Sequence, residues 1–144
     1  FYRLKELSIN NTSITDISPI LSLTTLMKLD LSKNPISEIE SISKLTGINE
    51  LELENTSIED LEPISKLSNL QTLNIAGTKI KSLKYLDKLY ILERLYINNT
   101  RVRNLKPLLN LNKLTFLQCY NTSIKSSRID EFKATHTKTE VVYY

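Results

Sequence analysis

Residues 48–58 have the sequence INELELENTSI, and this pattern of apolar and polar residues returns at one fixed interval along the chain. Each unit begins with a leucine or isoleucine, at Leu4, Leu26, Ile48, Leu70, Leu92 and Leu114. A threonine or asparagine follows at the ninth position and an isoleucine or valine at the eleventh. No insertion interrupts the six units, and one unit alone cannot bury its apolar side chains. The period therefore predicts stacked units that share one continuous core.

The spacing of apolar residues within one unit predicts a strand and a short helical turn. The first positions alternate apolar and polar residues, as in a half-buried strand, and stacked strands would form a parallel sheet. Outer residues such as Ile14, Ile17 and Ile20 are three positions apart, which suits 3₁₀ or short helical turns. At the ninth position, we expect the threonine or asparagine oxygen to accept hydrogen bonds from otherwise unpaired turn amides.

The pattern resembles the 22-residue class of leucine-rich repeats, found in bacterial internalins and in a regulatory subunit of protein phosphatase 1. The resemblance covers residues 4–124. It implies an α/β fold, a right-handed solenoid with a parallel sheet on the concave side and short 3₁₀ or helical turns on the convex side. In this class the concave sheet usually binds another protein, so the resemblance implies a non-catalytic protein-binding module.

The register divides the chain into three segments. Residues 1–3 are expected to end a preceding repeat or cap, because Phe1 occupies the twentieth position of a unit, so we expect the natural chain to continue before it. Residues 4–124 are the six repeats. Residues 125–144 are expected to form a C-terminal cap, with a helix capped by Ser127, an apolar face of Ile129 and Phe132, and a last strand at 140–144.

Polar strand positions are expected to point to solvent and to form two patches on the concave side. The repeat requires no aromatic residue there, yet several gather beside an arginine, which is the composition of interface hot spots. The predicted partner-binding residues are Arg94, Tyr96, Asn98, Phe116, Gln118 and Tyr120. A secondary acidic patch consists of Asp30, Glu50, Glu52 and Glu54. It suits a basic partner, or alternatively keeps the sheet soluble.

Composition argues against several other functions. The net charge is +3, and ten basic but only two acidic residues lie between Lys79 and Lys125. This basic stretch lacks glycines and interleaved stacking aromatics, so nucleic acid is not the expected partner. Cys119 is expected to be a small buried apolar residue and His136 a surface residue, which leaves no predicted metal, cofactor or nucleophile–base pair. No apolar run is long enough for membrane insertion by this segment.

Two alternative roles remain beside the protein-binding module. The chain could be a regulatory or targeting domain of a larger enzyme, or a structural spacer of a surface protein. In a spacer, the aromatic rings of the concave side would be covered by the cap or by a second copy. The resemblance leans toward a bacterial cell-surface or secreted location, and a cytoplasmic one stays open.

Overall fold

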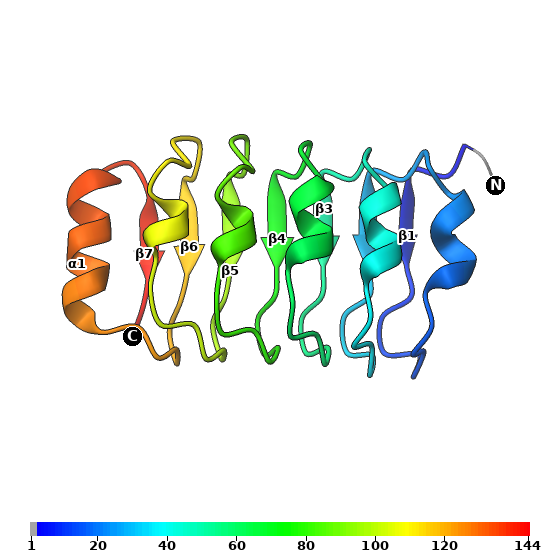
Figure 1. The fold of residues 1–144 in the computed structure, drawn as a ribbon, viewed down its shortest axis with the longest axis horizontal. Helices are drawn as coiled ribbons and strands as arrows, with labels where there is room; N and C mark the ends of the chain where they lie inside the picture. The colour runs from blue at the N-terminus through cyan, green and yellow to red at the C-terminus, as the bar shows by residue number, and fades with distance from the viewer. Residues whose placement is uncertain (1–2) are drawn as a thin grey trace.

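The computed structural model describes residues 3–144, which form a single parallel sheet lined by a row of helical turns (Figure 1). The seven strands follow the sheet in chain order: β1 (Glu6–Ser8), β2 (Lys28–Asp30), β3 (Glu50–Glu52), β4 (Thr72–Asn74), β5 (Arg94–Tyr96), β6 (Phe116–Gln118) and β7 (Glu140–Val142). The 3₁₀ turns are η1 (Ser18–Ser22), η2 (Glu40–Lys44), η3 (Glu62–Lys66), η4 (Lys84–Leu86) and η5 (Lys106–Leu108), and α1 spans Ser126–Thr135. The predicted solenoid is therefore confirmed. Phe1 lies outside the described residues.

The sheet keeps one register from repeat to repeat. Leu7 pairs with Leu29 and Leu29 with Leu51, and each further pairing up to β6 keeps the same separation along the chain. The last step, from Leu117 to Val141, is slightly longer, because α1 takes the place of a 3₁₀ turn. This regular register stacks like positions of the repeat beside one another, so a row of side chains along the solenoid can be derived from the sequence.

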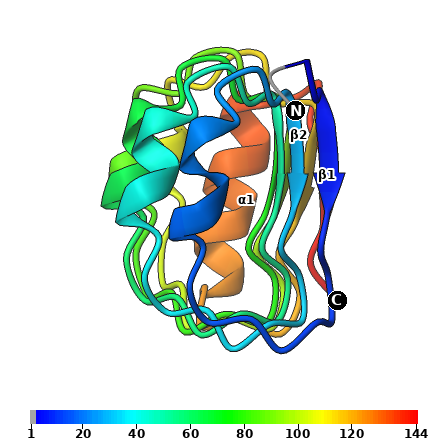
Figure 2. The same cartoon turned by 90° about the vertical axis from the view of Figure 1, so that its right-hand side faces the viewer.

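The core lies between the sheet and the helical turns (Figure 2). Inward-facing strand residues such as Leu51 and Leu95 are fully buried, as are outer residues such as Ile64 on the helical side. In the first repeat, Leu4, Leu7 and Ile9 are only partly buried, because nothing in the described residues stacks on that side of β1. Burial thus comes from the neighbouring repeat and not from the pattern alone.

The turn after each strand has a left-handed residue at the eighth position of the unit. Its φ angle runs from 51° to 67° in Asn11, Lys33, Asn55, Gly77, Asn99 and Asn121. Asparagine and glycine tolerate this conformation better than other residues. The requirement accounts for the asparagines that precede the threonine column.

The threonines at the ninth position of the unit donate hydrogen bonds to carbonyl oxygens, whereas we expected them to accept from turn amides. Thr122 does both, since its hydroxyl also accepts from the Ile124 amide at 3.5 Å. The Thr56 hydroxyl donates to the Leu53 carbonyl oxygen at 2.8 Å, and Thr78 and Thr100 repeat this contact. Asn34 replaces threonine in the second repeat and does both: its Oδ1 accepts from the Thr12 amide at 2.9 Å, and its Nδ2 donates to carbonyl oxygens. The threonines therefore satisfy carbonyls of their own turn, whereas Asn34 also ties two repeats together.

The C-terminal segment places α1 against the last repeat and β7 beside β6. Ile129 and Phe132 of α1 are buried in the core. Ser127 is inside the helix and not its cap, because the residue at the cap position is Lys125, which makes no side-chain capping bond. The division of the chain at residues 3 and 124 stays a prediction.

His136 is buried, although the sequence predicted a surface residue. Its side chain is 8% exposed and its ring stacks on Phe132, with 4.1 Å between ring centroids. Its Nδ1 lies 2.9 Å from the Thr135 hydroxyl, whereas its Nε2 has no partner among the described residues. The helix ends at Thr135, so the chain turns back there and folds the histidine onto the helix.

Candidate protein-binding surface

The outer surface of the sheet, which faces away from the helical turns and is here called the sheet face, carries the predicted site. Strands β5 and β6 bring Arg94 beside Phe116 and Tyr96 beside Gln118 by parallel pairing. Strand β7 extends the same rows, with Glu140 beside Phe116 and Val142 beside Gln118. The sequence did not predict Glu140 and Val142 as part of this surface, because the repeat pattern that fixes the register ends before β7.

Arg94, Tyr96 and Phe116 form one cluster, here called the Arg94 cluster. The guanidinium carbon of Arg94 lies 4.5 Å from the centre of the Phe116 ring. Its Nη2 donates to the Tyr96 hydroxyl at 2.7 Å, and its Nε donates to the same oxygen at 3.2 Å. The two rings are 5.2 Å apart and tilted by 45°. Arg94 is therefore held between a π face and a hydroxyl, with part of the cluster in contact with solvent.

Tyr120 and Gln118 continue the surface toward the ends of the strands, and both are half-buried. Tyr144, two residues beyond β7, is 92% exposed and contacts the ring of Tyr143 edge-on at 5.0 Å between centroids. A highly exposed aromatic side chain thus follows β7, beyond the residues predicted from the repeats.

Asn98 does not point to solvent as predicted, since it is only 5% exposed. Ser32 and Ala76 occupy the same position of their repeats and are buried too. At the same position Asn10 is exposed, and Glu54 and Tyr120 are partly exposed. This position follows the end of the strand, so alternation alone does not determine whether its side chain is buried. The side-chain oxygen of Asn98 has no hydrogen-bond partner among the described residues. Asn98 is therefore beneath the surface and not on it.

Asp30, in the acidic patch, accepts hydrogen bonds from two residues of the first repeat and from one residue of its own repeat. The Asn10 side-chain amide donates to Asp30 Oδ2 at 2.7 Å, and the Ser8 hydroxyl donates to the same oxygen at 3.1 Å. The Ser32 backbone amide donates to Asp30 Oδ1 at 3.0 Å. Partial burial by itself would raise the pKa of Asp30, but these hydrogen bonds together outweigh it and leave the pKa below its ordinary value. Asp30 is thus a stable anion.

The neighbouring carboxylates are in different electrostatic environments. The Lys28 ammonium lies 3.3 Å from Glu50 and 3.9 Å from Glu6, so it offsets part of the negative charge. Burial raises the pKa of Glu52, and the charges of Asp30, Glu50 and Glu54 add to the rise against a hydrogen bond from Asn74. Glu52 is therefore the carboxylate of this patch for which a cationic group would bring the largest relief.

The structure assigns no chemistry to the remaining candidates. Cys119 is buried, and its burial raises the pKa of the thiol to about 11, so the thiolate is scarce at neutral pH. Within residues 3–144, no three histidine, cysteine or acidic side chains are grouped in a way that could bind a metal ion. In the same range, no helix has the length and apolar character needed to cross a membrane.

Comparison with known proteins agrees with the architecture. A family model described as Leucine Rich repeats (2 copies) matches residues 2–44 and 46–88. The chain belongs to the leucine-rich repeat family. No curated protein matches the sequence significantly. Domains of this family are typically protein-interaction modules and generally non-catalytic.

Solved leucine-rich repeat structures resemble this chain closely. The internalin InlF of Listeria monocytogenes superposes with a TM-score of 0.91 at 29% identity, covering 96% of this chain and 41% of its own. Internalin C2 of the same species gives 0.81 at 31% identity, covering 95% and 69%. This chain thus spans well under half of the InlF structure. The repeats are of the internalin type, while the resemblance to the phosphatase subunit stays a prediction.

A more distant structure shares the fold alone. The ectodomain of the plant receptor kinase GASSHO1/SCHENGEN3 from Arabidopsis thaliana gives a TM-score of 0.76 at 21% identity, covering 98% of this chain and 18% of its own. It was solved in complex with CASPARIAN STRIP INTEGRITY FACTOR 2.

Proposed function

We propose that the chain is a non-catalytic module that binds another protein on its sheet face, over β5, β6 and β7. Arg94, Tyr96, Phe116 and Tyr120 act as the anchors, and Gln118 adds hydrogen bonds at their edge. Asn98 is buried and is therefore not one of the proposed contacts. The acidic patch would contact basic groups of the same partner.

The arrangement of the Arg94 cluster carries the proposal. Its guanidinium is bonded to the Tyr96 hydroxyl and stacked on Phe116 before any partner arrives. Fixing an arginine side chain in advance removes an entropy cost of about 1 kcal/mol that binding would otherwise include. Tyrosine and arginine are also enriched among residues that dominate binding energy. The cluster is thus a preorganised anchor on the sheet face.

The test is affinity capture with the wild-type chain and with a Tyr96→Ala, Tyr120→Ala double variant as baits, using extract of the native source and its surroundings. Proteins retained by the wild type and lost by the double variant identify the partner. We expect thermal unfolding of the double variant to stay close to that of the wild type, because both side chains are partly exposed.

A matched control separates the sheet face from exposed tyrosines in general. Tyr90 lies outside the strands and is an exposed tyrosine, so Tyr90→Ala should leave capture unchanged. A second variant, Arg94→Glu, should abolish capture by reversing one charge at the centre of the site. If wild type, double variant and Arg94→Glu all retain the same proteins, the site assignment is wrong.

The two alternative roles predict other results. In a structural spacer the rings would be covered by the cap or by a second copy. The cap leaves part of Tyr96, Phe116 and Tyr120 exposed, so a spacer would need a second copy over them, and a dimer lost in the Tyr96→Ala, Tyr120→Ala variant would reveal it. A regulatory domain of an enzyme would capture, or be joined to, a catalytic domain, which the full-length open reading frame would reveal. For either alternative role, the sheet face is the first surface to test.

A further inference from the structure

A second surface of the solenoid lies along the turns that connect the strands to the helical side, and its charge reverses half-way. In the first three repeats, positions 12, 13 and 15 of the unit carry acidic but no basic residues: Asp16, Glu38, Glu40, Glu59, Asp60 and Glu62. From the fourth repeat on, positions 10, 12 and 15 are basic with few exceptions. Leaving aside Lys79, which is paired with Glu59, and Lys84, which lines neither of the two hollows on this surface, we call the remaining basic residues the basic flank: Lys81, Arg101, Arg103, Lys106, Lys125 and Arg128.

The basic flank is hollowed in two places. The first hollow, of about 510 Å³, includes Lys81, Arg101, Asn99 and Asn121 in its lining, and at its edge the carboxylate of Glu59 pairs with Lys79 at 3.7 Å. The second, of about 480 Å³, is lined by Arg103, Asn104, Lys106, Ser123, Lys125 and Arg128. Arg101 and Arg103 are two residues apart on the same turn, so they join the hollows into one cationic surface along repeats four to six.

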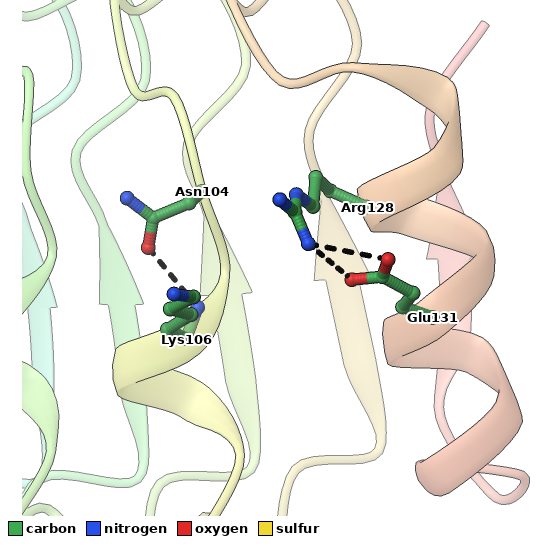
Figure 3. A network of polar contacts seen from close by, with 4 residues as sticks. All are labelled: Asn104, Lys106, Arg128 and Glu131. Atoms are coloured by element: carbon green, nitrogen blue, oxygen red, sulfur yellow. Dashed lines mark hydrogen bonds and ion pairs between the residues drawn. The ribbon is translucent and has the colours of Figure 1, made fainter.

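Figure 3 shows how the second hollow is built. Asn104 accepts a hydrogen bond from the Lys106 amide at 3.2 Å, which fixes the start of η5. Arg128 extends from the first turn of α1 toward this turn, and its Nη1 contacts Glu131 at 2.8 Å. One side of the hollow is therefore provided by the last 3₁₀ turn and the other by the C-terminal helix.

Most of these cations lack an anionic partner. Among the ion pairs of residues 3–144, only Arg128, with Glu131, involves the basic flank, while the neighbouring Lys79 pairs with Glu59 at the boundary of the acidic half. Lys81, Arg101, Arg103, Lys106 and Lys125 are exposed and unpaired in that range. Like charges in rows that stack about 4.8 Å apart repel one another, and an anionic ligand would relieve the repulsion.

The lining of the hollows indicates which anion would fit. Its charged groups are cationic except for Glu59, which is paired with Lys79. Beside them it has amides and hydroxyls, from Thr78, Asn99, Thr100, Asn104, Asn121 and Ser123, but no aromatic or aliphatic side chain. Single-stranded nucleic acid would need rings on which bases stack, and a protein partner would need an apolar centre. Amides and hydroxyls beside cations instead match a chain of hydroxyl and acidic groups. We propose that the basic flank binds an acidic polysaccharide.

The test measures binding of a size-defined heparin oligosaccharide to the chain at near-physiological salt. The variant is the triple substitution Arg101→Ser, Arg103→Ser and Lys125→Ser. Serine or threonine already occupies these positions in earlier repeats, at Ser13, Thr15, Ser37 and Ser57, so the turns should fold normally. We expect the variant to lose at least about tenfold in affinity and the salt dependence to become shallower by roughly one unit per lost contact.

The control removes the same amount of charge elsewhere. Lys5→Ser, Lys113→Ser and Lys138→Ser also reduce the net charge by three but lie outside the basic flank, so this variant should bind nearly as well as the wild type. Equal loss in both variants would assign binding to overall charge and overturn the proposal. It would also be overturned if a single-stranded DNA of equal charge bound the flank more tightly.

A second copy of the chain is the other occupant to exclude, because the acidic half of one copy could face the basic flank of another. Sedimentation equilibrium distinguishes the two. A dimer that dissociates in the flank variant would assign the surface to self-association and contradict the proposal, whereas a monomer that binds the oligosaccharide supports it. Neither outcome involves the sheet face, so the protein-binding proposal stands or falls separately.

Discussion

The first and fifth repeats, residues 4–25 and 92–113, share one sequence pattern and the same backbone elements but differ in burial and in what their sheet face presents. Leu7 of the first repeat is partly buried, whereas Leu95 at the same position is fully buried. On the sheet face, the first repeat has small polar residues that donate hydrogen bonds to Asp30, whereas the fifth has Arg94 and Tyr96 in the Arg94 cluster. The pattern fixes where each side chain points, while the adjacent repeats determine what it contributes.

The largest expected difference between the two repeats is in core stability. Leu95→Ala should lower the free energy of unfolding by about 3–5 kcal/mol, because it leaves a cavity in a close-packed interior. Leu7→Ala should cost about half as much or less, because its side chain already contacts solvent. Urea unfolding of both variants measures the difference. Equal losses would mean that the first repeat is as well packed as the fifth.

The next prediction concerns the tie between the first two repeats. Asn34 is 1% exposed, and its carboxamide bonds backbone groups of both repeats, so Asn34→Ala should cost about 2–4 kcal/mol. Thr100→Ala removes a single bond to the Ile97 carbonyl and should cost about 1 kcal/mol. Hydrogen exchange should also show faster opening of the first repeat in the Asn34 variant alone. Similar costs for both would contradict the bridging role.

The third prediction uses pH to separate two carboxylates of the acidic patch. The pKa of Asp30 is lowered in the fold, so its stabilisation is present above its unfolded pKa and is lost as pH falls through the folded pKa. Asp30→Asn should therefore cost about 1 kcal/mol at neutral pH and nearly nothing in strong acid.

Glu52 provides the matched contrast for that experiment. Its pKa is raised, so its charged form opposes folding once pH exceeds the unfolded pKa. Glu52→Gln should stabilise the chain slightly at neutral pH and not at low pH. Unfolding curves across pH check both variants, and effects of the same sign would contradict the assigned environments.

The smallest expected effect is on the stability contributed by the Arg94 cluster. Arg94→Gln removes a stacked cation and two hydrogen bonds at an exposed position, which should change the free energy of unfolding by about 0.5 kcal/mol or less. Differential scanning calorimetry is suited to such a difference. A loss of several kcal/mol would mean that the cluster is part of the framework and would weaken the proposed binding role.

The sequence predicted the parts of the molecule that depend on the constant period of the repeat. Strand order, the interior leucine column and the side-by-side placement of Arg94, Tyr96 and Phe116 all follow from stacking equal units. It failed where the period no longer governs the backbone. Asn98 lies past the end of its strand, and His136 lies past the end of α1, so neither alternation nor helical spacing determines its burial. The β7 residues of the sheet face were missed because β7 follows β6 at a longer interval than the repeat.

The constant register also sets the distances between surfaces on this molecule. Removing or duplicating one whole unit would restore every strand pairing, because each pairing between β1 and β6 joins residues that are equally far apart along the chain. Duplicating the fourth repeat, residues 70–91, which lies between the two surfaces, would move the acidic patch away from the Arg94 cluster by one strand spacing, about 4.8 Å, and would keep the residues of both. Unit duplication can therefore change the distance between the two surfaces in steps of one strand spacing.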